Sequence, residues 1–130
     1  MRKIKFRAWD KFNETHWCQG DSETVDEFFI RLKCIIEGGN NLIFEQFTGL
    51  LDKNGKEIYE GDIVDSDNFD LVVCFLSNYK YETSVDENDG EHYYVYLTGF
   101  FGHYKDKSGY STLHNELEVI GNIYENPELV

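Results

Sequence analysis

Apolar and polar residues alternate over much of the chain, which is the pattern of half-buried β-strands. At the start, Ile4, Phe6 and Ala8 alternate with Lys5 and its charged or aromatic neighbours, and residues 15–18 are predicted to pair back onto them. Further strands are predicted over residues 42–47, 63–64, 71–76, 93–101 and 117–123. Residues 71–76 are almost wholly apolar, so we expect that strand to be covered on both faces. The chain is therefore predicted to be mainly β.

Residues 24–36 fit two patterns. Alternation of Phe28, Ile30 and Leu32 favours a strand, and Gly38-Gly39-Asn40 would then close a hairpin onto residue 42. A short helix near residues 24–30 is the alternative, because Thr24 and Glu27 form a capping-box pair at the start of helical spacing. The frequency of β-branched residues favours the strand.

Residues 47–64 carry the densest local signals. Asn54-Gly55 predicts a hairpin with a type I′ turn, because both residue types tolerate positive φ. Gly61 predicts a second tight turn a few residues later. Two sharp turns around a very short strand are typical of small, strongly bent barrels. An Asp89-Gly90 pair suggests a further hairpin, Gly121 suggests a bulge, and Asn126-Pro127 a short terminal helix.

Three sequence blocks resemble the YopX family. The central block, residues 48–64, reads TGLLDKNGKEIYEGDIV; the opening block, 4–11, reads IKFRAWDK; the closing block, 118–129, reads EVIGNIYENPEL. They occur in the family's order and span the chain. The resemblance implies a small protein encoded by phages or prophages of Gram-positive bacteria, with an SH3-like barrel. It supplies no catalytic residue to carry over, and residues 12–46 and 65–116 fit no recognisable pattern.

A length of 130 residues predicts a single domain over residues 1–130. The predicted fold class is mainly β, a small bent SH3-like barrel with additional hairpins and one or two short helices. The formal net charge is −13, which disfavours nucleic acid and anionic lipid as partners. Positive charge gathers in residues 1–11. This cluster indicates a basic edge strand that blocks unwanted pairing, or a dipolar surface that selects a basic partner or drives self-association.

The three cysteines, Cys18, Cys34 and Cys74, are widely spaced and odd in number. They predict buried thiols in a reducing cytoplasm, that of the bacterial host, rather than disulfides or a zinc site. No apolar run has the length of a membrane span, and the start of the chain is unlike a signal peptide. No cofactor or metal is predicted. The acidic segments at residues 65–76 and 86–97 do not match an EF-hand, which needs a ligand at its fifth position, glycine at its sixth and glutamate at its twelfth.

Aromatic and acidic residues suggest an interaction surface. Trp9, Trp17, Tyr59 and Tyr124 would form an aromatic patch if they are exposed, and aromatic side chains dominate binding hot spots. Their alternative role is ordinary core packing. Glu60 and Asp62 accompany them in the central block, where they serve either turn formation or a carboxylate site. The predicted interaction surface comprises Trp9, Trp17, Tyr59, Glu60, Asp62 and Tyr124.

Three functions compete. The first is a non-enzymatic accessory protein that binds a host or phage protein and forms a homo-oligomer. The second is a role in nucleic-acid binding, in one of two forms. Either the phosphate backbone is bound by Arg2, Lys3, Lys5 and Arg7, or the acidic half of the chain mimics DNA. The third is a hydrolase or metal enzyme, which requires a pocket where several of Glu57, Tyr59, Glu60 and Asp62 converge. The absence of a catalytic motif favours the first.

Overall fold

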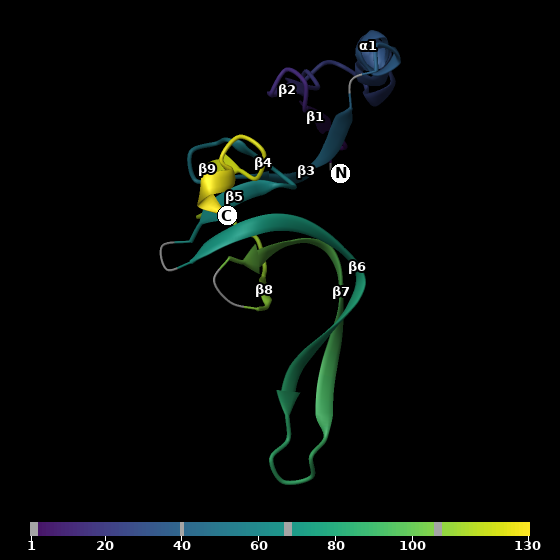
Figure 1. Ribbon diagram of the computed structural model, residues 1–130. Helices are drawn as coiled ribbons and strands as arrows, with labels where there is room; N and C mark the ends of the chain where they lie inside the picture. Colours follow the sequence, from purple (N-terminus) through teal and green to yellow (C-terminus); the bar gives the residue numbers. More distant parts are fainter. Residues whose placement is uncertain (1–2, 40, 67–68, 106–107) are drawn as a thin grey trace.

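The computed structural model describes residues 3–39, 41–66, 69–105 and 108–130. These residues form two antiparallel sheets and one α-helix (Figure 1). The strand order is β2-β1-β3-β4 in the first sheet and β8-β7-β6-β5-β9 in the second. The mainly β, barrel-like fold that the sequence predicts is confirmed. The elements are β1 (Phe6–Asp10), β2 (Thr15–Cys18), α1 (Val25–Glu37), β3 (Leu42–Leu51), β4 (Glu57–Tyr59), β5 (Asp62–Asp65), β6 (Asp70–Val85), β7 (His92–Tyr104), β8 (Tyr110–Ser111), β9 (Glu118–Asn122) and the 3₁₀ helix η1 (Pro127–Leu129).

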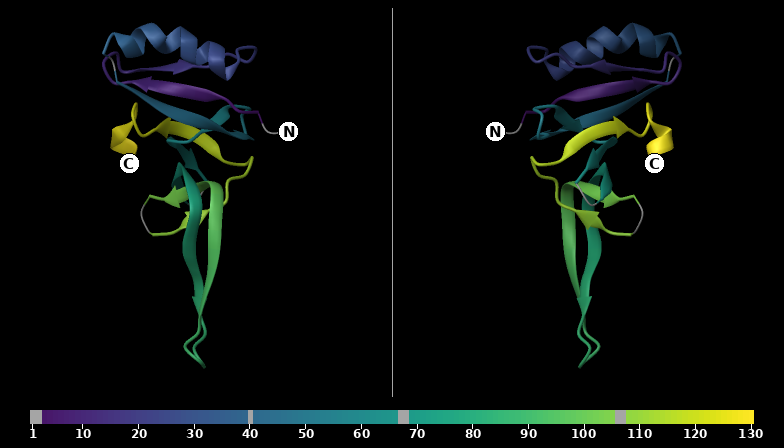
Figure 2. Two further views of the ribbon diagram at one scale, coloured as in Figure 1. Left: turned by 90° about the vertical axis from the view of Figure 1, so that its right-hand side faces the viewer. Right: turned by 90° about the vertical axis from the view of Figure 1, so that its left-hand side faces the viewer.

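The elements stack in layers, with α1 outermost over the first sheet and the second sheet beyond (Figure 2). One hydrophobic cluster lies between α1 and the first sheet and contains Ala8, Phe28 and Leu32. A second cluster, with Ile58 and Leu117 at its centre, joins β4 to the second sheet. Each cluster buries apolar surface that would otherwise contact water, which is the main force holding each layer to the next.

Residues 25–37 form a helix, so the prediction of a strand there is wrong. The Oγ1 of Thr24 accepts a hydrogen bond from the N–H of Glu27, and Glu27 Oε1 accepts one from the N–H of Thr24. This capping box satisfies backbone N–H groups that have no hydrogen-bond partner within the first turn of a helix. Phe28 and Leu32, one turn apart, are buried against the first sheet. The predicted hairpin at residues 38–40 is also wrong where described, because Gly38 donates to the carbonyl of Cys34 and ends the helix.

The basic first strand is not an edge strand, which corrects the sequence-based prediction. β1 pairs with β2 on one side and with β3 on the other. Lys5, just before the strand, and Arg7, within it, are only 4% and 7% exposed. Arg7 is covered by β5 of the second sheet, whose Asp62 contacts its guanidinium, whereas Lys5 lies against Asp21 and Glu57. Arg2 lies outside the described residues.

The two predicted turns of the central block are present, but the first has a different type. Gly55 has a φ of 81° and its N–H bonds the carbonyl of Asp52, while Asn54 does not share the positive φ that a type I′ turn requires. The carboxylate of Asp52 explains the difference, since Oδ1 accepts hydrogen bonds from the N–H groups of both Asn54 and Lys56. Gly61, with a φ of 87°, makes the second turn as predicted.

The strand predicted at residues 71–76 is the start of a much longer one. Leu71 and Val73 are buried, whereas Phe75 is 48% exposed, so only the first part of β6 is covered as expected. β6 then continues to Val85 and pairs with β7 along almost its full length. The hairpin predicted at Asp89-Gly90 is confirmed. The distal halves of β6 and β7 project from the rest of the molecule (Figure 2), and we call residues 76–100 the arm.

Two predictions near the C-terminus are confirmed. The register of β9 against β5 shifts between Gly121 and Val119, which is a bulge next to the predicted glycine. Asn126 and Pro127 begin η1 as expected, although the helix is a single 3₁₀ turn and Asn126 makes no side-chain cap.

The prediction of buried cysteines fails for two of three, because Cys18 and Cys34 are exposed and Cys74 is half-buried; all three are free thiols.

Candidate functional site

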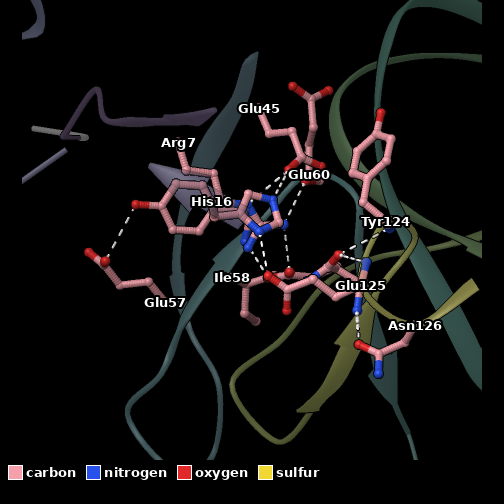
Figure 3. A network of polar contacts seen from close by, with 12 residues as sticks. Arg7, His16, Glu45, Glu57, Ile58, Glu60, Tyr124, Glu125 and Asn126 are labelled. Carbon is pink, nitrogen blue, oxygen red and sulfur yellow. Dashed lines mark hydrogen bonds and ion pairs between the residues drawn. The ribbon is translucent and has the colours of Figure 1, made fainter. Parts of the chain in front are cut away.

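The centre of the molecule is a buried ion-pair network built around Arg7 (Figure 3). Arg7 Nε lies 3.0 Å from Glu45 Oε1, and Arg7 Nη2 lies 2.8 Å from Asp62 Oδ1. The guanidinium also stands over the ring of Tyr59, 4.7 Å from its centroid. Burial alone would lower the pKa of Arg7, but the charges of Asp62 and Glu45 together outweigh burial and raise it. The network therefore ties β1, β3 and β5 together through one permanently charged side chain.

His16 extends this network to the C-terminal segment. Its Nε2 lies 2.9 Å from Glu45 Oε1, and its Nδ1 lies 2.8 Å from Glu125 Oε1. A neutral imidazole has only one N–H, so both contacts are hydrogen bonds only when the ring is protonated. The hydrogen bond from His16 is the largest cause that lowers the pKa of Glu125. In its charged form, His16 bridges two carboxylates from segments 80 residues apart in the chain.

Gly61 makes room for Glu45. The side chain of Glu45 is fully buried, and its Oε2 accepts no hydrogen bond from the described part of the chain. A Cβ at position 61 would overlap that oxygen. Close by, Asp62 Oδ2 accepts a hydrogen bond of 2.8 Å from the N–H of Tyr59. Asp62 thus fixes the tight turn that the sequence predicts and at the same time holds Arg7.

Lys5, the residue before β1, is itself buried and pairs with two carboxylates that reach solvent. Its Nζ lies 2.6 Å from Asp21 Oδ1 and 3.0 Å from Glu57 Oε2. Together with the pairing of Arg7, this means that two of the four cations considered for phosphate binding are buried and already matched by carboxylates. A phosphate could reach them only by displacing those carboxylates, and at Arg7 this would leave Glu45 and Asp62 buried without their partner.

The six residues predicted as an interaction surface lie in different environments. Trp9 and Tyr124 stack, with ring centroids 5.6 Å apart and planes 14° apart, and Trp9 is 7% exposed. Trp17 is on the opposite face of the first sheet, half-buried against α1, and donates from Nε1 to Asp10. Tyr59 is 5% exposed and packs on Phe47. The four aromatic residues therefore form no continuous exposed patch.

The acidic members of the set also separate. Asp62 lines a cavity of ≈ 370 Å³ together with Arg7 and His16, whereas Glu60 lines another, of ≈ 360 Å³, together with Glu45. Glu57 pairs with Lys5, and the Tyr59 hydroxyl donates to Glu57 over 3.5 Å. Burial raises the pKa of both Glu60 and Tyr59. Of the four residues of the carboxylate-enzyme hypothesis, Asp62 alone lines the first of these cavities and Glu60 alone the second.

Sequence reasoning missed the residues that complete the network, Glu45, His16 and Glu125. Glu45 carried a usable signal, since it is the first charge in the apolar run of residues 42–47 and an ionised group there must be paired. His16 and Glu125 carried none, because their meeting depends on tertiary structure alone. Among the described residues no three His, Cys, Asp or Glu side chains are grouped in a way that could hold a metal ion.

In contrast to this buried network, the arm exposes much of its surface to solvent. Several of its large apolar side chains are exposed to solvent, on both faces of the ribbon. Val95 is 41% and Tyr96 63% exposed, and adjacent residues of one strand point to opposite faces. The turn between its strands, residues 86–91, contains four acidic residues and no cation. Within the described residues, this part of β6 pairs only with β7, which leaves the outer edge of each strand without a partner strand.

The fold and the central network define a small, mainly β, barrel-like protein with a network of buried ion pairs at its centre. A family model described as YopX protein matches residues 5–130, and the chain belongs to this family. Among solved structures, the chain is similar to protein EF1440 from Enterococcus faecalis, with 21% identity, a TM-score of 0.45 and 99% of each chain covered. A search of curated proteins finds no match. None of the helical segments in the described residues has the length and apolar character that crossing a membrane requires.

Proposed function

We propose that this chain is a non-enzymatic protein-binding module, encoded by a phage or prophage, that works in the cytoplasm of the bacterial host and self-associates. The observation that carries the proposal is the arm. Monomeric proteins rarely expose contiguous apolar patches larger than a few hundred Å², and larger ones mark interaction sites. Tyr93 and Val95 lie on one face of β7 and Tyr94 and Tyr96 on the other, and each is more than 40% exposed. An aromatic-rich ribbon of this kind is suited to protein contact.

Self-association follows from the open edges of the arm. A second copy can add a strand to an unpaired edge, with main-chain hydrogen bonds supplying affinity and side-chain rings supplying specificity. The acidic turns would repel if two arms met tip to tip. An antiparallel arrangement, with each tip beside the base of the other arm, keeps the turns apart and covers the aromatic residues of both copies.

The test is the mass of the protein in solution over a range of concentrations, measured by sedimentation equilibrium. We expect wild-type protein to exceed the monomer mass and Val95→Ser/Tyr96→Ser to be monomeric, because the pair removes one exposed apolar residue from each face of the arm. Phe12→Ser is the matched control, since Phe12 is 78% exposed but lies in the turn between β1 and β2. A wild-type protein that stays monomeric throughout contradicts self-association.

Binding of another protein is tested separately with immobilised protein and host lysate. Stoichiometric capture that Val95→Ser/Tyr96→Ser abolishes and Phe12→Ser preserves is the expected result. Capture that is identical for both variants removes the arm from the proposal. If wild-type protein captures nothing and is also monomeric, the protein-binding function itself is overturned.

A second candidate function, mimicry of a nucleic-acid backbone, is favoured by the acidic turn. Asp86, Glu87, Asp89 and Glu91 stand at the tip with no cation between them. Two of these carboxylates organise the turn, since Asp86 accepts from Asn88 N–H and Asp89 from Glu91 N–H. Glu87→Gln/Glu91→Gln is therefore the discriminating variant, because it removes charge without removing these caps. Mimicry predicts that duplex DNA displaces a captured basic protein and that this variant captures less of it. A captured protein that neither DNA nor salt displaces would contradict mimicry.

A further inference from the structure

A cavity of ≈ 480 Å³ opens where the C-terminal segment crosses the turn between β1 and β2. Three separate pieces of chain contribute to its wall. Trp9 comes from β1, Glu14 from the turn after it, and the remaining residues from the segment that follows β9. The lining residues are Trp9, Glu14, Tyr124, Glu125, Pro127 and Glu128.

One side of this cavity is aromatic and held in a fixed position. Trp9 is nearly buried and lies between two rings, stacked on Tyr124 at 5.6 Å and tilted against His16 at 5.0 Å. Tyr124 is the more exposed member of the stack. Its backbone is fixed by Asn122, whose Oδ1 accepts from the N–H groups of Tyr124 and Glu125. The phenol ring is therefore presented on a preformed turn, which reduces the entropy that a ligand must overcome.

The rest of the lining is anionic. Glu14, Glu125 and Glu128 each contribute a carboxylate, and no Lys or Arg is among the described residues that line the cavity. Glu125 is anchored, because its Oε1 lies 2.8 Å from His16 Nδ1, and this hydrogen bond holds the pKa of Glu125 below its usual range. An ionised carboxylate is thus maintained next to the aromatic stack.

An aromatic wall combined with carboxylates selects a planar cation. The face of an aromatic ring attracts cations, and a guanidinium adds stacking and a fork of N–H donors that matches carboxylate oxygens. We infer that this cavity binds an arginine side chain presented by a partner protein. The inference rests on the proposed protein-binding function and gives it a chemistry: a partner segment carrying a solvent-exposed arginine, attracted by a chain of net charge −13.

The test uses a blocked pentapeptide with one central arginine among glycines, titrated into isotopically labelled full-length protein. The two indole N–H signals report separately, since Trp9 lines the cavity and Trp17 lies on the opposite face of the sheet. We expect a saturable shift of the Trp9 signal, no shift for Trp17, and a dissociation constant on the order of 1 mM for so small a ligand. The same peptide with citrulline, which keeps the shape and loses the charge, is expected to bind at least about tenfold more weakly.

Variants of the chain complete the design. Glu14→Gln/Glu128→Gln removes two exposed carboxylates from the rim of the cavity. We expect this variant to bind the arginine peptide about fivefold more weakly, or weaker still. Glu116→Gln, an exposed charge outside the lining, is the matched control and is expected to have no effect. Equal shifts of both tryptophans, equal binding of the citrulline peptide, or an unaffected Glu14→Gln/Glu128→Gln protein would each overturn the inference.

Failure of this inference and failure of the proposed function are distinguishable. The Val95→Ser/Tyr96→Ser protein is expected to bind the peptide normally, because the arm is remote from the C-terminal segment that lines the cavity (Figure 2). If the peptide does not bind while arm variants still lose self-association or capture, the arginine pocket is wrong and the protein-binding function stands. If the peptide binds and the arm variants behave as wild type, the role given to the arm is wrong.

Discussion

Arg7 and Asp62 meet at 2.8 Å with side chains that are only 9% and 2% exposed, although 55 residues separate them in the chain. A charge pair so far from water is held by its geometry and by further hydrogen bonds, which Glu45 and the N–H of Tyr59 supply. Removing one partner from such an arrangement leaves the others charged, buried and unmatched.

Arg7→Met is therefore expected to lower the free energy of unfolding by about 3–5 kcal/mol, because Glu45 and Asp62 lose their common partner. Urea unfolding followed by circular dichroism measures the change. Arg31→Met is the control, since Arg31 pairs with Glu23 at the surface, where such a pair contributes about 1 kcal/mol or less. Comparable losses for the two variants would contradict the central role of Arg7.

Gly61→Ala is expected to destabilise the protein more than Gly55→Ala does. Both glycines have positive φ, so alanine is strained at either position. At position 61 the new Cβ also overlaps Glu45 Oε2, while at position 55 it meets open space. We expect the difference between the two variants to reach about 1–3 kcal/mol in thermal or urea unfolding. If both variants lose the same stability, the packing of Glu45 against Gly61 is not a constraint.

Asp52 predicts a pH dependence. Its Oδ1 accepts from Asn54 and Lys56, and its Oδ2 accepts 3.0 Å from the N–H of Val119 in β9. Burial would raise the pKa of Asp52, but these three backbone donors outweigh burial and lower it from 3.8. A pKa that is lower in the folded state stabilises the protein at pH values above the pKa of the unfolded state. This contribution is lost as the pH falls through the pKa of the folded state.

Asp52→Asn is accordingly expected to cost about 1–2 kcal/mol at neutral pH. The gap between wild type and variant should narrow as the pH falls below about 4, where the wild-type carboxylate also becomes neutral. Urea unfolding at several pH values measures it, with Glu116→Gln as an exposed control. A gap that stays constant down to about pH 2 would show that ionisation of Asp52 contributes nothing.

Thr24→Ala tests why residues 25–37 are helical. Loss of the N-cap oxygen leaves the N–H of Glu27 without its partner, which is expected to cost about 1 kcal/mol in unfolding free energy. Ser22→Ala, an exposed change two residues earlier, should cost little. Equal effects would indicate that packing of Phe28 and Leu32, rather than the cap, determines where the helix starts.

The parts of the fold that depend on neighbouring residues were predictable from sequence. The turns at residues 54–55, 61 and 89–90 were found because glycine with asparagine or aspartate has a strong local preference. The helix was mistaken for a strand because Phe28, Leu32 and Ile36 fit both periods, and only the capping box at Thr24 separates the two. The length of β6 was missed because its second half is polar and packs on no core.

The central network was beyond sequence reasoning for a different reason. Arg7 reaches Glu45 and Asp62 across 38 and 55 residues, so no local pattern joins them. Charge near the first strand suggested exposure, whereas in the structure Lys5 and Arg7 are buried and paired with carboxylates. Tyr59 and Asp62 were identified as important, but their partners could be known only from the tertiary structure.

The contacts of Asp52 and its neighbour also constrain the order of events during synthesis. The N–H of Lys53 bonds the carbonyl of Leu117, and β5 completes its pairing only with β9. The barrel-like centre therefore cannot close until residue 122 has left the ribosome. Until then the hydrophobic cluster around Ile58 lacks Leu117, so part of its apolar surface stays in contact with water.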